Sequence, residues 1–458
     1  MRPTKSSRSN AEVFASREPG ARIAVAVLRL LFGALYAEDF AIVLWEGTRV
    51  PATGNERFVL RVNSAGALRS AFSPPIDLSA GRAFGAGLLD VEGDLEHAVD
   101  TLRQAGAALR TLDAIRMARL LRRLPKIPTP RLRAANLRGR IHSRARDRAA
   151  IGFHYDLPIA FYRSFLDREM VYSCAYFDDG VQSLDDAQAA KLDHSLRKLR
   201  LRPHERLLDI GCGWGALVIR AAQHGARALG ITLSRLQFEE AKRRIAMAGL
   251  GERAQVELRD YRDLGGERFD KVVSIGMFEH VGRSRFAEYF KAAYEALRPG
   301  GLFLNHAIAD QDRDWGDGRA SGFMGEFIFP DGELVPISES LASAERAGFE
   351  VRDVENLREH YARTLRAWGA NFVRNRAAAI AAAGETSFRL WRLYMAGSAQ
   401  GFAAGRLGIY QSLLAKPDRD GRVELPATRR DLYPSRRIEP GESRAVVAQR
   451  IEHQASNL

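Results

Sequence analysis

The chain has 458 residues, long enough for two or three domains, and its 46% hydrophobic share is ordinary for a soluble globular protein. The formal net charge of +13 predicts an anionic partner, either nucleic acid, a membrane surface or an acidic substrate. The two cysteines, Cys174 and Cys212, argue against a disulfide scaffold or a zinc cluster and favour a reducing compartment. The apolar stretch closest to a membrane span, residues 23–36, is interrupted by Arg29 and is followed by no signal-peptide cleavage site.

The first quarter of the chain predicts a disordered tail over residues 1–20 and then a small α+β domain over residues 21–115. No group of catalytic residue types gathers there, so we interpret the domain as a structural or lipid-handling accessory. The elements expected in order are a helix over 21–36, strands over 41–45 and 57–62, and a helix over 95–109 with Asp94 as its N-cap.

A basic connector is expected over residues 116–148, where arginines and leucines alternate around Pro125, Pro128 and Pro130. One interpretation is a solvated linker. The other is an arm that lies on anionic phospholipid, because each Lys or Arg near such a surface contributes about 1 kcal/mol. Nucleic-acid binding usually requires interleaved aromatic residues, and this stretch has none.

Residues 149–416 alternate strand-like and helix-like segments, which predicts a doubly wound α/β sheet. Residues 417–458 are rich in Pro, Arg and Asp and are expected to form an extended tail. Polar residues that could serve a ligand fall at or just past the ends of five expected strands, where such sheets bind ligands. The expected strands are 206–210, 227–231, 255–258, 269–275 and 302–307, and the polar residues at their ends are Asp209, Thr232, Asp260, Glu279 and His306.

The sequence LLDIGCGWG, residues 207–215, predicts a strand, a glycine turn and then a helix over 216–223. This layout lets the backbone approach a nucleotide-like ligand closely. The Asp-x-Gly-x-Gly-x-Gly spacing lacks the Gly-Lys-Ser/Thr of a phosphate loop, so it suits a nucleoside without a polyphosphate. It resembles the first motif of S-adenosylmethionine (SAM) dependent methyltransferases, although a dinucleotide fold is also compatible with the glycines alone.

Further polar residues suit the parts of a nucleoside. Thr232 and Gln237 could hydrogen-bond the ribose hydroxyls, while Ser234 could do so or simply cap the helix expected over 234–248. Asp260 and Tyr261 could accept from the adenine amine and cover the ring. The glycine turn would supply Asp209, Gly211, Gly213, Trp214 and Gly215.

Several runs between about residue 150 and residue 415 are recognisable together. They are His154–Asp156, Met170–Phe177 (MVYSCAYF), Leu208–Gly215, Gly230–Ser234, Gln237, Asp260–Asp263, Met277–Gly282 (MFEHVG), Phe327–Pro330 and Tyr361–Leu365. In these runs the chain resembles the cyclopropane-fatty-acid synthase family of SAM-dependent methyltransferases. The resemblance implies a Rossmann-like, mostly parallel seven-stranded sheet with helical insertions around an acyl site, and a homodimer.

The resemblance also implies the chemistry. The methyl group of SAM is attacked by a cis double bond of an acyl chain in a membrane phospholipid, and loss of a proton closes a cyclopropane. Bicarbonate, the general base, would be framed by Cys174, Glu279, His306 and Tyr361, while Tyr172 and Ser173 would join the SAM site. The protein is therefore expected in the cytoplasm, at the inner face of the membrane. A carbocation requires a dry pocket, and its candidate aromatic lining, each member of which could equally be core, is Phe153, Phe161, Phe165, Phe323 and Phe327.

Two departures from the family pattern leave the product open. Ser398 stands where family members usually carry a Cys, and it can hydrogen-bond bicarbonate but cannot supply a thiolate. Residues 157–159, Leu-Pro-Ile, stand where the family usually has a Gly-Asn pair. A methylene- or methyl-branching acyl methyltransferase is the alternative within the family. A nucleic-acid methyltransferase lacks its target-base motifs here, and a lipid-binding protein without catalysis remains the alternative from another class.

Overall fold

The computed structural model describes residues 18–432 except 129, 131, 182, 312–321 and 424. The chain divides into a compact unit of residues 1–423 and a second unit of residues 424–458. The described part of the second unit contains one 3₁₀ turn, η5 (Arg430–Leu432). The tail expected from residue 417 therefore begins inside the first unit, and most of the tail expected over residues 1–20 lies outside the described residues.

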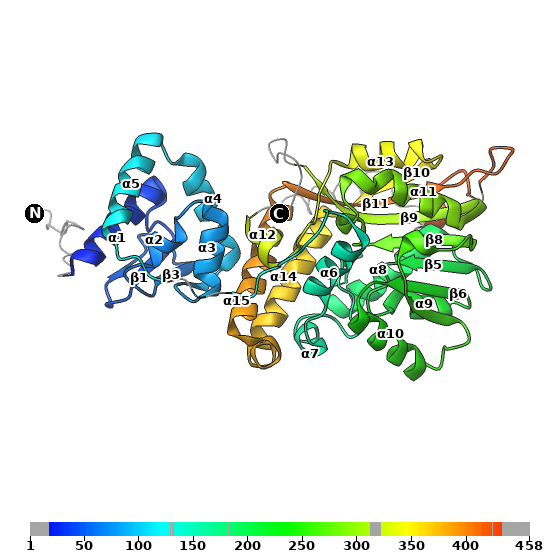
Figure 1. Cartoon of the computed structure of the whole chain (residues 1–458), viewed down its shortest axis with the longest axis horizontal. Coiled ribbons are helices and arrows are strands. Elements are labelled where there is room, and N and C mark those ends of the chain that lie inside the picture. The colour runs from blue at the N-terminus through cyan, green and yellow to red at the C-terminus, as the bar shows by residue number, and fades with distance from the viewer. Residues whose placement is uncertain are drawn as a thin grey trace, which may run out of the picture. The chain divides into compact units, whose positions relative to one another are not determined.

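The N-terminal part of the first unit is a small α+β domain (Figure 1). Its sheet has the order β2-β1-β3-β4, in which β1 runs parallel to β3 and the other pairs are antiparallel. The strands are β1 (Phe40–Leu44), β2 (Arg49–Val50), β3 (Phe58–Val62) and β4 (Leu89–Gly93). The helices are α1 (Pro19–Phe32), α2 (Ala67–Ala71), α3 (Ile76–Gly85), α4 (Leu95–Ala108) and α5 (Thr111–Arg123), with a 3₁₀ turn η1 (Gly33–Leu35).

The helices and strands expected in this domain are confirmed to within a few residues. The carboxylate of Asp94 accepts the backbone N–H of His97 at 2.9 Å, so this residue caps α4 as expected. The expected boundary at residues 115 and 116 falls inside α5, because Met117 and Leu121 are buried in the same core as α1. The first part of the basic connector is therefore helical and belongs to the domain.

The larger part of the first unit contains a seven-stranded sheet of order β10-β11-β9-β8-β5-β6-β7. Strands β7, β6, β5, β8 and β9 are parallel, and β11 is antiparallel to both β9 and β10. The expected mostly parallel, doubly wound sheet is confirmed. The strands are β5 (Arg206–Ile210), β6 (Arg227–Thr232), β7 (Ala254–Leu258), β8 (Phe269–Ile275), β9 (Leu297–Asp310), β10 (Glu350–Asn356) and β11 (Leu407–Ala415).

Two layers of helices cover the sheet (Figure 1). The chain runs from β5 outward through β6 and β7 and then returns to the other side of β5 with β8, so the order reverses between β5 and β8. The carboxyl ends at such a reversal form the ligand crevice of open α/β sheets. On one side lie α8 (Leu184–Leu199), α9 (Ala216–Gln223) and α10 (Arg235–Met247), and on the other α11 (Phe286–Ala296) and α13 (Ile337–Arg346).

A helical cap with its own aromatic core lies beyond the carboxyl ends of the strands (Figure 1). Its core includes Phe161, Phe165, Trp368 and Trp391, all below 5% exposed. The cap consists of α6 (Arg144–Tyr155), α7 (Ile159–Arg163), α12 (Gly322–Phe327), α14 (Arg358–Arg374) and α15 (Arg376–Ala403). These are the helical insertions expected around the site.

Strand β9 differs from its expected course. The strand begins at Leu297 rather than at the expected residue 302, and its register with β8 shifts between Phe269 and Lys271. The strand also continues to Asp310, so His306 lies inside it opposite Ile275 rather than near its end. No described helix is long and apolar enough to cross a membrane.

Candidate active site

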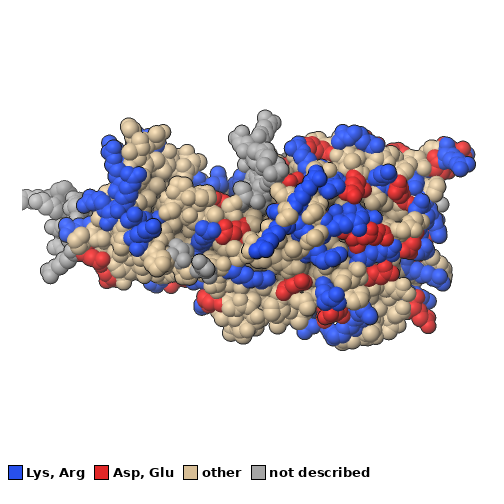
Figure 2. Space-filling view, in the orientation of Figure 1, with Lys and Arg blue, Asp and Glu red and all other residues tan. Residues whose placement is uncertain are grey.

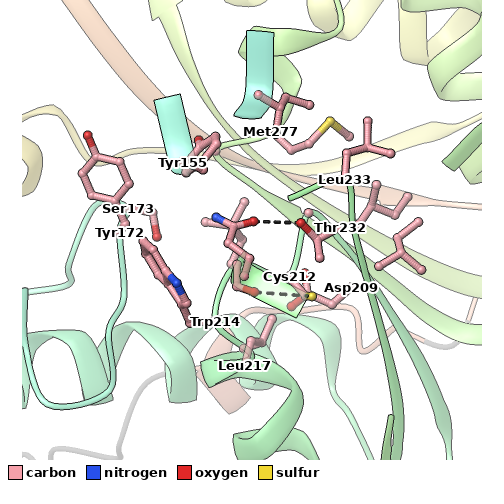
Figure 3. Close-up of a pocket in the computed structure, with 18 of the residues that line it drawn as sticks. Tyr155, Tyr172, Ser173, Asp209, Cys212, Trp214, Leu217, Thr232, Leu233 and Met277 are labelled. Atoms are coloured by element: carbon pink, nitrogen blue, oxygen red, sulfur yellow. Dashed lines mark hydrogen bonds between the residues drawn. The ribbon is translucent and has the colours of Figure 1, made fainter. Parts of the chain in front are cut away.

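A pocket of about 130 Å³ lies at the carboxyl ends of β5, β6 and β8. Figure 3 shows Tyr172, Ser173 and Trp214 on one side of this pocket and Thr232, Leu233 and Met277 on the other. We call it the cofactor pocket. Most of the residues expected to bind the cofactor line it, namely Tyr172, Ser173, Asp209, Gly211, Gly213, Trp214, Thr232, Gln237 and Tyr261.

The glycine turn after β5 forms the floor of this pocket. Gly211 and Gly213 have φ values of +84° and +54°, which favour glycine. A Cβ at Gly211 would lie 2.8 Å from Cβ of Met277, so a side chain there would also collide with the opposite wall. The backbone N–H of Cys212 donates to the carbonyl of Ile231 at 3.0 Å, which ties the turn to the end of β6.

Two uncharged polar side chains stand at the end of β6. The Thr232 hydroxyl donates to the Gln237 carbonyl oxygen at 2.7 Å, drawn as a dashed line in Figure 3. Both side chains are about 5% exposed and line the cofactor pocket. Because its carbonyl is occupied, Gln237 has its amide N–H groups left as donors, which suits the hydroxyl groups of a ribose.

A buried ammonium lies in the same pocket. Lys191 of α8 donates to the hydroxyl of Ser173 at 2.9 Å. Burial lowers the pKa of Lys191 to about 8. Burial also raises the pKa of Asp209 to about 7, although the Lys191 charge acts in the opposite direction. This positive and negative pair matches the amino-acid end of SAM, which carries a carboxylate and an ammonium.

The segment that carries Tyr172 and Ser173 is held by one carboxylate. Asp167 accepts the backbone N–H groups of Glu169 and Val171 at 2.8 and 2.9 Å, around Met170 with φ +57°. These hydrogen bonds fix the backbone turn after which Tyr172 and Ser173 face the glycine turn.

A second, larger cavity of about 570 Å³ begins beside the cofactor pocket. We call it the apolar cavity, because hydrocarbon and aromatic groups make up most of its lining. The two cavities share a wall, which consists of Tyr155, Tyr172, Ser173, Ile275, Gly276 and His280. Four of the expected catalytic residues, Glu279, His306, Tyr361 and Ser398, line the apolar cavity.

Two of these residues present unpartnered polar atoms. Oε1 of Glu279 accepts the backbone N–H of Ile308 at 2.8 Å, while Oε2 has no partner among the described residues. Nδ1 of His306 lies 3.2 Å from the amide nitrogen of Gln411, while Nε2 has no partner there. Buried polar groups are nearly always paired, so both atoms are available to a ligand that enters the cavity.

The pKa shifts of Glu279 and His306 favour forms of these side chains that donate hydrogen bonds into this corner of the cavity. Burial raises the pKa of Glu279 to about 7, against the effect of the Ile308 N–H. Burial lowers the pKa of His306, and the Lys191 and Lys198 charges reinforce the shift. With the Gln411 amide donating to Nδ1, the neutral ring carries its proton on Nε2. Neutral His306 therefore offers a donor, and Glu279 offers one in its protonated form, which is well populated near neutral pH because its pKa is about 7.

A model of the family described as mycolic acid cyclopropane synthetase matches residues 142–412. The chain belongs to this family of SAM-dependent methyltransferases. A protein of Pseudomonas putida named "Probable fatty acid methyltransferase" is 40% identical over 394 residues, which cover 85% of this chain and 95% of that protein. The cyclopropane synthase structure from Mycobacterium tuberculosis matches with a TM-score of 0.56 at 35% identity, covering 59% of this chain and 98% of that one.

A second solved structure, of a mycolic acid cyclopropane synthase complexed with SAH and CTAB, also has a TM-score of 0.56 and 35% identity, over 59% of this chain and 98% of that one. The sheet of β5 to β11 is thus the Rossmann-like fold of the methyltransferases. The family match begins at residue 142, so α1 to α5 lie outside it.

Four of the residues that were expected at the active site do not line either cavity. Gly215 precedes α9 with φ +84° and packs against Ala241, so its role is local packing. Ser234 caps α10 by accepting the N–H of Gln237 and donates to Asp156 at 2.6 Å. The Asp260 carboxylate is engaged by Arg262 at 2.6 and 2.8 Å, and against the effect of burial this lowers its pKa.

Cys174 is the fourth of these residues. Its side chain is fully buried, and its Sγ faces the carbonyl oxygens of Ala175 and Leu357 at 3.3 and 3.8 Å. Burial raises the pKa of its thiol. In this conformation the thiol is a packed group behind the wall rather than part of it.

The aromatic lining of the apolar cavity also differs from the expected one. Phe323 lines it, whereas Phe161, Phe165 and Phe327 are buried in the cap core and Phe153 packs under Arg133. The aromatic residues at the catalytic end are instead Tyr155, Tyr172, Phe329, Tyr361, Tyr394 and Phe402. The Tyr172 hydroxyl donates to that of Tyr394 at 3.4 Å, which links the shared wall to α15.

Sequence reasoning missed Lys191, although a signal was present. Gln188, Lys191 and Ser195 are spaced by three and four residues, on one face of α8 with Leu192, and all are buried. Polar residues on the inner stripe of an amphipathic helix indicate a polar ligand or partner beneath it.

Proposed function

We propose that the protein transfers a methylene group from SAM to the cis double bond of an unsaturated fatty acyl chain and forms a cyclopropane. The observation that carries the proposal is the wall shared by the cofactor pocket and the apolar cavity. A methyl donor in the first pocket meets hydrocarbon in the second, rather than a base or a small polar molecule. The comparisons support this reading, because relatives are named fatty acid methyltransferase and cyclopropane synthase.

The wall geometry suits the reaction. The π electrons of the double bond form the new C–C bond as the S–C bond breaks, which leaves S-adenosylhomocysteine and an alkyl cation. A double bond is a weak nucleophile, so holding it against the methyl group supplies much of the acceleration. Tyr155, Tyr172 and Tyr394 line the apolar cavity where the double bond would lie. Their rings would exclude water there and stabilise the cation through cation–π interactions.

Bicarbonate fits the corner beyond the wall. Glu279 Oε2 and His306 Nε2 are buried without partners, and the donors that they offer match a small oxyanion. Tyr361 and Ser398 line the same cavity, and their hydroxyls could bind the oxyanion as well. Bound there, bicarbonate would supply a general base, and loss of a proton from the transferred methyl would close the ring.

A methylene branch is the second candidate product, and Ser398 favours it. A hydride shift followed by loss of a proton from the same methyl group gives a branch of identical mass. A different base position selects between the two outcomes. A methyl branch would in addition require a hydride donor.

The substrate we propose is an acyl chain of a phospholipid in an anionic membrane. Figure 2 supports this with Lys and Arg side chains gathered over α5 and along the segment that leads to α6. On α5, Leu112 and Ile115 are 68% and 45% exposed beside Arg116 and Arg119. Exposed apolar side chains among arginines are typical of a helix that lies on anionic lipid.

The test is incubation of the purified protein with methyl-labelled SAM and vesicles of dioleoyl phosphatidylglycerol. We expect label in acyl chains that gain one CH₂ unit, detected by mass spectrometry, and NMR separates ring protons from vinyl protons. The control is Gly213→Asp, which puts a carboxylate where a Cβ meets no atom within 4 Å. If the protein binds SAM in calorimetry but yields no labelled acyl chain, catalysis is refuted and only the lipid-binding function is left.

A further inference from the structure

The apolar cavity does not end in the catalytic domain. From Glu279 and Tyr361 it continues past α15 into the N-terminal domain. Six elements of that domain contribute to its lining, which includes Phe32 of α1, Phe58 of β3, Leu68 of α2, Phe84 of α3, Val91 of β4 and Ala98 of α4. These residues also belong to the core of the domain, so the cavity enters that core instead of lying on its surface.

Helix α15 is the wall along which the cavity passes between the domains. It packs against α3 and α4 and presents Leu393, Gly397 and Gly401 to the cavity. A Cβ at Gly397 would meet no atom within 4 Å, so the absence of a side chain there leaves the passage wide.

Hydrogen bonds and an ion pair between the two domains fix their relative position around this passage. Arg389 of α15 donates to the carbonyls of Phe84 and Leu89 at 2.7 Å. Arg82 of α3 makes a bidentate pair with Glu326 of α12 at 2.6 and 2.7 Å. Charge-assisted bonds of this kind fix orientation. The passage is therefore part of the folded unit.

The chemistry of the far part of the cavity selects its occupant. Among the N-terminal-domain residues that line it, Asp77 alone is charged, and its carboxylate accepts the backbone N–H of Phe323 at 3.3 Å. None of these N-terminal-domain residues is a cation, and Arg406 of the catalytic domain, which also lines the cavity, donates to the side-chain carbonyl of Gln400 on α15. A carboxylate or phosphate among the N-terminal-domain residues would therefore lose its hydration without a partner from that domain. A hydrocarbon chain end loses nothing and gains from burial.

We infer that the N-terminal domain binds the methyl-terminal half of the acyl chain, with the double bond held at the shared wall and the polar end of the lipid outside. The domain then measures the chain length beyond the double bond. This inference rests on the proposed function and adds a subsite to it. The family match begins at residue 142, so the subsite lies in a domain outside the region that the family model describes.

The direct test uses the wild-type protein and a phosphatidylglycerol whose oleoyl chain carries a diazirine at its methyl end. Irradiation followed by peptide mass spectrometry is expected to place adducts within residues 18–123, competed by unlabelled dioleoyl lipid. Adducts confined to residues 142–423, or none that unlabelled lipid competes, would overturn the subsite. This readout needs no turnover, so it is independent of whether SAM-dependent product forms.

A kinetic test uses Ala98→Trp, which fills the cavity from α4, and its matched control Ala107→Trp on the exposed side of the same helix. Substrates keep the double bond at a fixed distance from the carboxyl end and vary in length on the methyl side. For the wild type and the control we expect kcat/KM to rise by about fourfold per added methylene until the cavity is filled. Ala98→Trp is expected to abolish that rise while the shortest chain keeps its rate. An equal loss for all lengths, with SAM binding intact, would contradict the inference.

Discussion

The ammonium of Lys191 donates to the hydroxyl of Ser173 at 2.9 Å, and both side chains line the cofactor pocket. Lys191 has further N–H donors, and Asp209 lies close enough for the two charges to affect each other's pKa. We therefore assign Lys191 a positioning role: it holds Ser173 and supplies the positive charge at the amino-acid end of the cofactor.

The first prediction concerns the Lys191→Met variant. Loss of one charged hydrogen-bonding group costs about 1.5–3 kcal/mol, so SAM should bind roughly 10- to 150-fold more weakly in calorimetry. 5′-Methylthioadenosine, which lacks the amino-acid end, should bind with nearly unchanged affinity. Lys291→Met, at a 72% exposed side chain, is the control. Equal weakening of both ligands would mean that the substitution only disturbs the pocket.

The second prediction concerns Glu279→Ala. This variant removes one donor from the corner that also contains His306, which should weaken binding of a small oxyanion by about 1–3 kcal/mol. Turnover in bicarbonate-depleted buffer should fall by roughly 5- to 150-fold, and added bicarbonate should restore much of it. The measurement is initial rate against bicarbonate concentration for the variant and the wild type. A rate that is low at every concentration would show that Glu279 acts in some other way.

The core of this site could be predicted from the sequence because its signals are local. Residues with a side chain rarely adopt the positive φ that Gly211 has in this turn, so the glycine pattern in the sequence locates the turn directly. Thr232 ends β6 and Glu279 comes shortly after β8, and the common direction of these parallel strands brings both residues to one edge of the sheet.

The rest depended on packing that the sequence does not display. The second half of α5, residues 116–123, looked like part of a linker because four of its eight residues are arginines, yet Met117 and Leu121 place one side of it in a core. Cys174 lines neither cavity because its Sγ points toward backbone carbonyls. The apolar cavity draws its lining from α1 to α4 and from α15, which are far apart in the chain.

The third prediction concerns the product. Ser398 of α15 lines the apolar cavity that also contains the corner of Glu279 and His306. The Ser398→Cys variant replaces a small hydroxyl with a larger, more polarisable thiol, which should shift the base relative to the cation. We expect the ratio of ring to methylene branch, measured by NMR of extracted acyl chains, to rise by several-fold. Ser398→Ala, which has neither group, is the control, and identical ratios in all three proteins would exclude a role for this residue.

The fourth prediction concerns pH and stability at His142, in the segment between α5 and α6. The ring is 2% exposed, and its nitrogens lie 3.7 Å from Asp147 and 3.5 Å from Glu333, at ion-pair distance. The Asp147 carboxylate first, and Glu333 with it, raises the pKa of His142 from 6.5 to about 9. A base whose pKa is raised by folding stabilises the folded state fully below its unfolded value, and that stabilisation is lost as the pH rises through the folded value.

The wild type should therefore exceed His142→Gln in the midpoint of thermal unfolding by the largest margin near pH 6. The margin should shrink between pH 6.5 and 9 and nearly vanish above pH 10, because the wild-type ring is then neutral like the amide. His224→Gln, at a half-exposed side chain 3.5 Å from Asp193, is the control and should show a small margin throughout. A His142→Gln margin that stays constant with pH would mean that the ring stabilises the segment by packing under Gly282 rather than by charge.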